Sequence, residues 1–426
     1  MNMRSACLMM KYALLVAAVG ASASTYQFTD VELDAGLPTA LHTKVMTNTI
    51  TGEMLQVVVD SGGKTAKLQL RSPATGKLRD VLVPLTDASA IRDTINGTHF
   101  AGSVLVPYAN RIANGTYSFF GKRMHLDRNE CNALRCGALH GFLFNRSLSV
   151  VSQQAWKDDG VDYARLTLGY NFTGEERDTP GWPFECSVRI DYTLQTNIHG
   201  RTTFALTISA TKYPVQRLLQ PRTSRGPLSS PFARSSVLCS SFTAGSTATD
   251  GGALPWTASW HPYFRVADVS QTKMQFDTCG TSPAMGWRHM IMTTGAPRKG
   301  TLIPTGYSEP WTTFDGVTPI GGTATKPTYF DDEFKATLPL HVGDEAVCGT
   351  ITQRIIDGNE TTTLTAGATT WQVFTGAKEG WGWDAIALEP MRGAADAFNN
   401  GDGLTVLEPG EQFASQFVVA LEKHHI

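Results

Sequence analysis

Alternation of apolar and polar residues is the feature that most constrains how this chain can fold. Apolar residues occupy every second position over 186–194, and the same period returns over 165–170, 204–208 and 417–421. A period of two places one side of a strand on a core and the other in solvent. No long window after residue 23 has helical spacing, so we expect an all-β protein, a large antiparallel β-sandwich. Further strand-like runs are Leu55–Val59, Thr116–Phe120, Ser147–Val151, Thr350–Ile356, Thr370–Thr375 and Ala385–Leu388.

Composition agrees with a turn-rich β protein and narrows the class of partner. The 426 residues include 40 Gly and 21 Pro, which suit many turns. Lys and Arg number 36 against 38 Asp and Glu. This balance gives no electrostatic basis for binding nucleic acid or an anionic membrane. We expect one domain over 24–426 and a monomer or weak dimer.

The N-terminus has the pattern of a secretory signal peptide. Arg4 and Lys11 supply positive charge, and Ala13–Val19 is a short apolar run. The small residues Ala21-Ser22-Ala23 follow, as at a signal-peptidase site. The apolar run is too short to cross a bilayer of about 30 Å. The pattern predicts a signal peptide over 1–23 and a secreted protein.

The cysteines and glycosylation triplets fit secretion. Six cysteines remain after Cys7, an even number that permits disulfides without fixing their pairing; six reduced, buried thiols are the alternative. Cys131 and Cys136 are near enough in sequence to close a small loop. Together with the signal, the N-x-[ST] triplets predict a secreted glycoprotein. The five acceptors are Asn96, Asn114, Asn145, Asn171 and Asn359.

The segment Tyr213–Gly252 differs from the rest of the chain. It is rich in Ser, Pro, Arg and Thr, has no strand period, and its first acidic residue is Asp250. An irregular stretch of this length is uncommon within a compact domain. We interpret it as a surface insertion or disordered excursion, with a retained intron or an ordered active-site flap as alternatives.

Four short stretches carry side chains suited to chemistry on a polar ligand. Asn110 and Arg111 offer several hydrogen-bond donors, and His140 lies beside a glycine that suits a tight turn. His261 stands among aromatic residues, and Glu389 ends an apolar run, where a carboxylate needs a partner or a raised pKa. Each residue also has a structural alternative. Arg111 would be an arginine at a strand end, and His140 a core histidine with its hydrogen bonds made. His261 would belong to an aromatic core strand, and Glu389 to a structural ion pair.

Taken together, these stretches resemble the aldose 1-epimerases, also known as galactose mutarotases. The motifs follow the family's order over about residues 35–421, apart from the insertion. They are Asn110-Arg111-Ile112, Leu139-His140-Gly141, His261-Pro262-Tyr263-Phe264, Phe330-Asp331-Asp332-Glu333-Phe334 and Glu389-Pro390. The resemblance implies a single supersandwich, the galactose mutarotase-like fold, with an open cleft on one sheet.

The resemblance also implies an acid–base mechanism on free glucose or galactose, without metal or cofactor. Glu389 is the implied base, which takes the proton of the C1 hydroxyl, and His261 is the acid, which protonates the ring oxygen. His140 is expected to polarise the ring oxygen or a neighbouring hydroxyl. From this mechanism we expect Glu389 and His261 to face each other across the cleft, far enough apart for a pyranose ring.

The remaining roles belong to substrate binding. The resemblance implies that Asp331 fixes a ring hydroxyl, with the adjacent Asp332 as the alternative. It implies that Asn110 and Arg111 bind the other end of the sugar. A disulfide between Cys131 and Cys136 would stiffen the loop that leads to His140.

Three other functions fit the same sequence. A hexose-6-phosphate 1-epimerase would need two or more Arg or Lys converging on the phosphate. A non-catalytic carbohydrate-binding protein predicts loss of Glu389 or His261, and both are present. A lyase or hydrolase on a related sandwich would need two carboxylates at one bond. The preferred sugar stays open.

Overall fold

The computed structural model describes most of the chain downstream of residue 22. The described residues are 23–38, 40–132, 136–213, 252–278, 286–289, 308–310, 314–323, 326–327, 330–336, 350–368, 370–375 and 384–424. The predicted signal peptide therefore lies outside the described residues except for its last position. Residues 214–251, nearly all of the predicted insertion, lie outside them as well.

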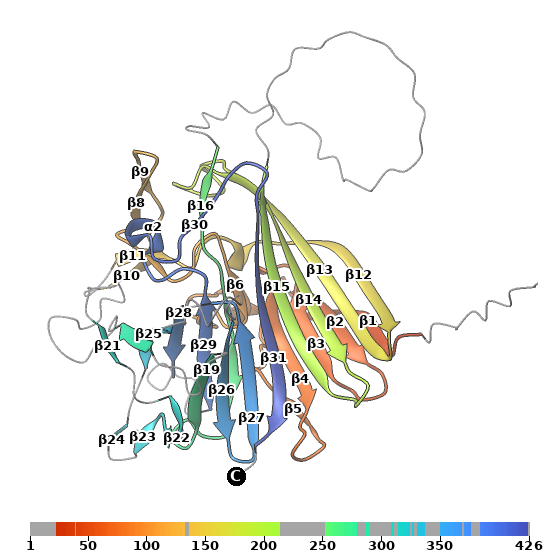
Figure 1. The fold of residues 1–426 in the computed structure, drawn as a ribbon. Coiled ribbons are helices and arrows are strands. Elements are labelled where there is room, and N and C mark those ends of the chain that lie inside the picture. Colours follow the sequence, from red (N-terminus) through yellow and green to blue (C-terminus); the bar gives the residue numbers. More distant parts are fainter. Residues whose placement is uncertain are drawn as a thin grey trace, which may run out of the picture.

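One layer of the molecule is a nine-stranded antiparallel sheet (Figure 1). Its strand order is β12-β13-β14-β15-β31-β27-β26-β19-β22. The C-terminal strand β31 thus lies in the interior of the sheet, between β15 and β27. The bounds are β12 Ser149–Asp158, β13 Val161–Thr173, β14 Glu185–Thr196, β15 Thr202–Lys212, β31 Gln412–Lys423, β27 Glu360–Ala366, β26 Ile351–Asp357, β19 Lys273–Thr278 and β22 Asp315–Pro319.

The second layer is an eight-stranded sheet. Its order is β21-β20-β25-β28-β29-β17-β6, and β18 also pairs with β29. The bounds are β21 Ser308–Pro310, β20 Gly286–His289, β25 Asp331–Ala336, β28 Thr370–Phe374, β29 Ala385–Met391, β17 Ser259–His261, β6 Ser103–Leu105 and β18 Tyr263–Arg265.

Smaller elements complete the described part of the chain. A five-stranded sheet comprises β1 Tyr26–Leu33, β2 Leu41–Asn48, β3 Met54–Val58, β4 Lys64–Arg71 and β5 Leu78–Asp80. A three-stranded sheet joins β10 Glu130–Cys131, β11 Cys136–Leu139 and β7 Arg111–Ala113. Strand pairs are β16 Leu254–Trp256 with β30 Thr405–Leu407, β8 Thr116–Phe119 with β9 Lys122–His125, and β23 Gly322–Thr323 with β24 Lys326–Pro327.

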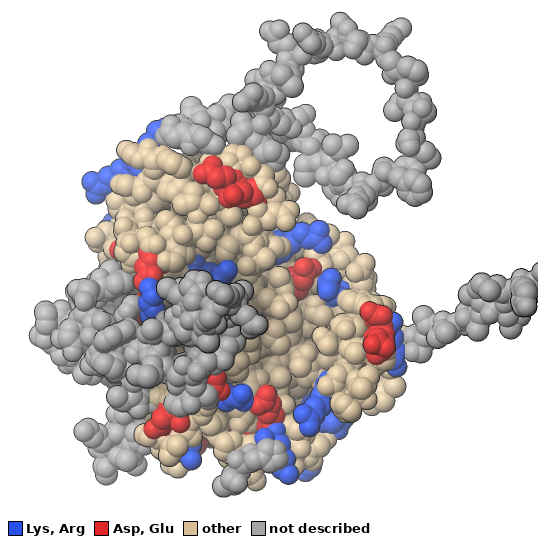
Figure 2. Space-filling model, viewed as in Figure 1, with Lys and Arg blue, Asp and Glu red and all other residues tan. Residues whose placement is uncertain are grey.

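Helices are few and short. Those among the described residues are α1 Ala88–Arg92, the 3₁₀ turn η1 Leu143–Asn145 and α2 Ala397–Asn400. In that part of the chain, no helix has both the length and the apolar character needed to cross a membrane. Figure 2 shows Lys and Arg interspersed with Asp and Glu on the face in view. The nearly all-β architecture confirms the fold class predicted from the period of two.

Aromatic side chains fill the space between the two large sheets. Trp260, on β17, packs its ring 5.7 Å from that of Phe204 and 6.3 Å from that of Phe417, on the nine-stranded sheet. Trp371, on β28, lies 5.6 Å from Phe276 of β19 in the same way. These contacts make the two sheets a sandwich, because each buries its apolar face against the other.

The pleat of the eight-stranded sheet then sends the next residues to its other face. Successive side chains along a strand point to opposite sides. His261 follows Trp260 and Gln372 follows Trp371, so both leave the core side. Glu389 is the register partner of Gln372 on β29 and shares its face. The sandwich therefore presents a row of polar side chains on the outer face of one sheet.

Candidate active site

The polar row lines a small cavity. The cavity encloses about 250 Å³, just below the ~300–1,000 Å³ usual for drug-sized ligands, and so suits something as small as a monosaccharide. Every site residue inferred from the sequence lines it. The lining residues are Ile95, Asn96, His99, Phe100, Asn110, Arg111, Glu130, Leu139, His140, His261, Tyr263, Asp331, Gln372, Phe374 and Glu389.

His261 and Glu389 are in direct contact, because they lie on neighbouring strands in matched register. Ser259 pairs with Met391, and Tyr263 pairs with Ala387, so the residue midway on each side is His261 and Glu389. Directly opposed residues on one face approach closely. His261 Nε2 lies 3.2 Å from Glu389 Oε1. The expectation that a pyranose ring fits between the two groups is therefore wrong: they stand side by side, on one wall.

Burial sets the charge of this pair. Glu389 is 2% exposed, and desolvation, aided by the charge of Asp331, raises its pKa well above the ordinary value, against the opposing effect of Arg111. Desolvation lowers the pKa of His261 to about 3. The carboxyl of Glu389 is therefore protonated, and the imidazole of His261 is neutral, with a hydrogen on one of its two ring nitrogens. Perturbation of this kind inside a cleft marks a functional site.

Two polar atoms of the pair have no hydrogen-bond partner among the described residues. They are Nδ1 of His261 and Oε2 of Glu389, and both are buried. Buried polar atoms are rarely left without a partner, since each costs roughly 1–3 kcal/mol. The two atoms lie on residues that line the cavity, so they are available to hydrogen-bond a polar ligand there.

His140 is held by a strained turn against Asn110. Both residues have left-handed backbones, with φ of 64° and 54°. The His140 N–H donates to the Asn110 carbonyl at 3.0 Å, and the Asn110 N–H donates to His140 Nδ1 at 3.2 Å. Desolvation lowers the pKa of His140 well below its ordinary value, so the ring is neutral. Because Nδ1 accepts, Nε2 carries the hydrogen and is a donor.

Gly141 makes this turn possible. Its φ is 70°, and a Cβ added there would lie 2.1 Å from the Val106 carbonyl oxygen. Only glycine fits such an approach. The expectation of a tight turn at Leu139-His140-Gly141 matches this geometry.

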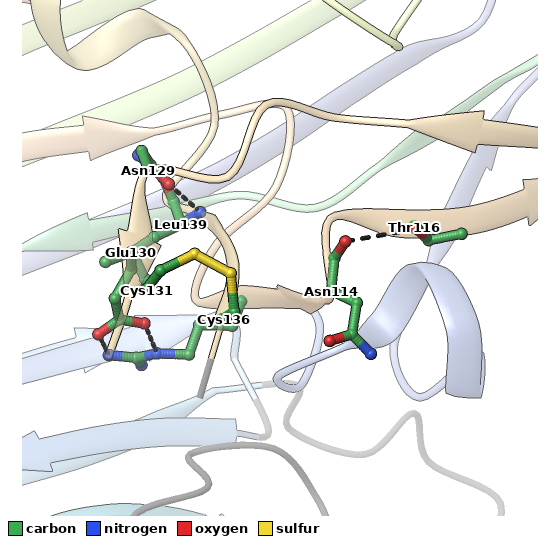
Figure 3. Close-up of a disulfide and its surroundings, with 8 residues drawn as sticks. Asn114, Thr116, Asn129, Glu130, Cys131, Cys136 and Leu139 are labelled. Carbon is green, nitrogen blue, oxygen red and sulfur yellow. Dashed lines mark hydrogen bonds and ion pairs between the residues drawn. A yellow bond between two sulfur atoms is a disulfide. The ribbon is translucent and has the colours of Figure 1, made fainter. Parts of the chain in front are cut away.

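Arg111 is fixed by a carboxylate that sequence reasoning missed. Its Nε donates to Glu130 Oε2 at 2.6 Å and its Nη2 to Glu130 Oε1 at 2.9 Å. Figure 3 shows Glu130 beside the Cys131–Cys136 disulfide. Nη1 donates to Asn110 Oδ1 at 3.0 Å. Burial lowers the pKa of Arg111, but the hydrogen bonds and charge of Glu130 outweigh this and raise it, so the guanidinium stays charged.

Gln372 is the second residue that the sequence reasoning missed. Its Nε2 donates to Asp331 Oδ1 at 2.7 Å, and its Oε1 accepts from Asn110 Nδ2 at 3.2 Å. The signal available in the sequence was a polar residue between the apolar Trp371 and Val373, and the structure buries it. Asp331 lines the cavity, whereas Asp332 is not among the lining residues.

Aromatic rings shape the walls around the histidines. Tyr263 stacks on His261 with ring centroids 5.2 Å apart and planes at 11°. Phe100 meets His140 edge to face at 4.6 Å. Of the three aromatics flanking His261 in sequence, Tyr263 lines the cavity, while Trp260 and Phe264 belong to the core. Apolar ring faces of this kind pack well against the C–H faces of a sugar.

One set of described residues has the donor atoms for a metal ion. Ligand atoms of His140, His261 and Glu389 lie within 4.8 Å of one another. Two imidazoles and a carboxylate suit a transition metal. The same three groups also suffice for proton transfer without a metal.

Comparison with a known family agrees with the sequence motifs. The family model described as aldose 1-epimerase matches residues 46–219. This span includes Asn110, Arg111 and His140, and ends before His261 and Glu389. No curated protein matches the chain.

Solved structures of similar fold extend over almost the whole chain. A galactose mutarotase-like protein from Clostridium acetobutylicum has a TM-score of 0.61 at 14% identity, covering 94% of this chain and 99% of its own. Galactose 1-epimerase from Lactobacillus acidophilus has a TM-score of 0.60 at 13% identity, and the match covers 94% of this chain and 100% of that protein. The GalM/aldose epimerase homologue from C. elegans has a TM-score of 0.56 at 15% identity, and the match covers 88% of this chain and 97% of that protein. The chain thus has the galactose mutarotase-like fold, and its resemblance to the aldose 1-epimerase family is confirmed.

Proposed function

We propose that the protein is an aldose 1-epimerase that interconverts the α and β anomers of an uncharged aldohexose such as glucose or galactose. The observation that carries this proposal is the contact between His261 and Glu389 on the wall of a monosaccharide-sized cavity. Ring opening requires an acid and a base close to the same carbon, and this pair supplies both.

The contact geometry suits the reaction because of where the reacting oxygens lie. The C1 hydroxyl oxygen and the ring oxygen are both bonded to C1. One must lose a proton and the other must gain one as the ring opens. Two groups 3.2 Å apart on one wall can therefore address both atoms, and separation across the ring is unnecessary.

The cycle moves two protons, one from the pair of side chains and one from the sugar. The proton of the pair starts on Glu389, because burial favours the neutral forms of both groups. Its movement across the contact to His261 makes the carboxylate the base and the imidazolium the acid. Glu389 takes the proton of the C1 hydroxyl while His261 protonates the ring oxygen, and the C1–O bond to the ring oxygen breaks. Rotation about C1–C2 in the open-chain aldehyde precedes closure, in which the two groups exchange roles.

The other lining residues position the sugar. We assign His140 Nε2–H to the ring oxygen or an adjacent hydroxyl, since Nδ1 is occupied by Asn110. Asp331 accepts a hydrogen bond from a ring hydroxyl. Gln372 orients the Asp331 carboxylate by donating a hydrogen bond to it. The hydrogen-bonded series Arg111–Asn110–Gln372–Asp331 offers donors and acceptors along the cavity.

The charges in the cavity favour an uncharged sugar over a hexose 6-phosphate. Among the described lining residues, Arg111 is the one Lys or Arg side chain, and it is engaged by Glu130. The lining also includes the carboxylates of Glu130 and Asp331, whereas Glu389 is protonated. A phosphate requires converging cations, and this lining supplies a surplus of acids.

Polarimetry of freshly dissolved α-glucose and α-galactose tests the proposal. Purified protein should speed the approach to equilibrium rotation in proportion to its concentration. A protein that binds these sugars and leaves the rate of rotation unchanged would be a carbohydrate-binding protein, and the epimerase assignment would be withdrawn.

A further inference from the structure

Three consecutive residues fasten one short segment to the strands of the site. Asn129 makes two hydrogen bonds to the backbone of Leu139: its Nδ2 donates to the carbonyl at 3.0 Å, and its Oδ1 accepts from the N–H at 2.7 Å. Cys131 is bonded to Cys136, its register partner. Glu130 lies between Asn129 and Cys131, as Figure 3 shows. Its side chain is 16% exposed and pairs with Arg111 of the cavity. The segment is thus held on both sides of Glu130.

This fixed carboxylate changes what Arg111 presents to a ligand. A guanidinium offers its charge most strongly through a two-pronged contact with an anion. Glu130 already occupies Nε and Nη2 in that manner. The remaining nitrogen, Nη1, is shared with Asn110. The cavity therefore receives a hydrogen-bond donor whose positive charge is largely compensated.

We propose that Glu130 is a specificity-determining residue: by occupying the paired nitrogens of Arg111, it makes the cavity select uncharged sugars and reject sugars that carry a carboxylate or phosphate. The proposal rests on the assignment of the cavity as a sugar site. Glu130 is a positioning residue, because it acts through Arg111. The disulfide and Asn129 keep its carboxylate from turning away when an anion competes for the guanidinium.

The probes are D-glucose and D-glucuronate, which differ by a carboxylate at C6. Dissociation constants for both are measured by isothermal titration calorimetry on the full chain and on Glu130→Gln. This variant keeps the shape of the side chain and removes its charge. We expect the affinity for glucuronate relative to glucose to rise on the order of tenfold or more, since one uncompensated charge acts on the anion at close range.

Glu360→Gln is the matched control. Glu360, which is buried, pairs with the partly buried Arg79 at 2.5 Å through one nitrogen, and neither residue lines the cavity. Its ratio of affinities should equal that of the wild type. Glu130→Asp, which keeps the charge, should retain the wild-type preference at least in part, and a rise in the ratio as large as that of Glu130→Gln would contradict the proposal.

The outcomes separate this proposal from the assignment of activity. If Glu130→Gln weakens both sugars equally and the ratio stays constant, Glu130 is merely structural and the proposal is overturned. If the ratio changes while polarimetry shows no turnover by the wild type, the selectivity stands and the epimerase assignment fails. If no variant binds either sugar, both are overturned.

Discussion

Replacing Glu389 by Gln should separate activity from stability. The amide matches the carboxyl in shape and cannot accept the C1 proton. We expect anomerisation to fall by ~10²–10⁴-fold, the usual contribution of one acid–base group. The folded state should nevertheless gain stability at neutral and alkaline pH, because the carboxyl is buried with a raised pKa.

The sign and size of this effect on the free energy of unfolding follow from proton linkage. Above the ordinary pKa of 4.5, the unfolded chain releases the Glu389 proton while the folded protein retains it. The free energy of unfolding therefore falls by about 1.4 kcal/mol per pH unit until the pH reaches the folded-state pKa. His261 has the opposite slope between its folded pKa of about 3 and its ordinary 6.5. The two slopes cancel where they overlap, so the net loss from this pair begins above pH 6.5.

Thermal melts followed by circular dichroism at intervals from pH 5 to 9 measure this difference. The melting temperature of Glu389→Gln relative to wild type should rise with pH, on the order of 2 °C per pH unit within the window. The pH dependence is diagnostic, since the amide adds a constant offset of its own. A difference that is flat, or that falls with pH, would show that Glu389 is ionised in the folded protein, and the reasoning about its burial would be refuted.

Three further predictions follow from the site and the sequence. His261→Asn should remain folded and lose about 10²-fold or more in anomerisation, measured by polarimetry; a near-wild-type rate would remove His261 from the mechanism. Dialysis against EDTA should leave the rate unchanged, whereas a loss restored by a transition metal would assign a metal to the set of His140, His261 and Glu389. Mass spectrometry of native protein should find an N-terminus near Ser24 and glycan on at least one sequon; an intact Met1 in cytosolic protein would contradict secretion.

Local patterns in the sequence predicted the fold class better than they predicted the geometry of the site. The alternation over 186–194 falls within β14, where buried and partly exposed residues alternate as expected. Motifs far apart in sequence do converge on one cavity. The contact between His261 and Glu389 could not be predicted, because it depends on β17 lying beside β29, and no local pattern encodes which strands become neighbours.

The residues that sequence reasoning missed differ in how visible they were. Gln372 is a buried polar residue in an apolar strand, the same signal that singled out Glu389. Glu130 precedes a cysteine in a polar stretch and resembles an ordinary solvated acid. Its role arises only because the three-stranded sheet sets β10 and β7 on either side of β11, which brings its carboxylate to Arg111.

The position of β31 has a consequence for biosynthesis. This strand pairs on one side with β15, which is synthesised early, and on the other side with β27, which is synthesised late. Until it leaves the ribosome, both neighbours have unpaired backbone edges, which are templates for association with other chains. The central closure of the sheet thus waits until residues 412–423 have been synthesised. Nascent or truncated chains lacking residues 412–423 should depend on chaperones and accumulate in the insoluble fraction.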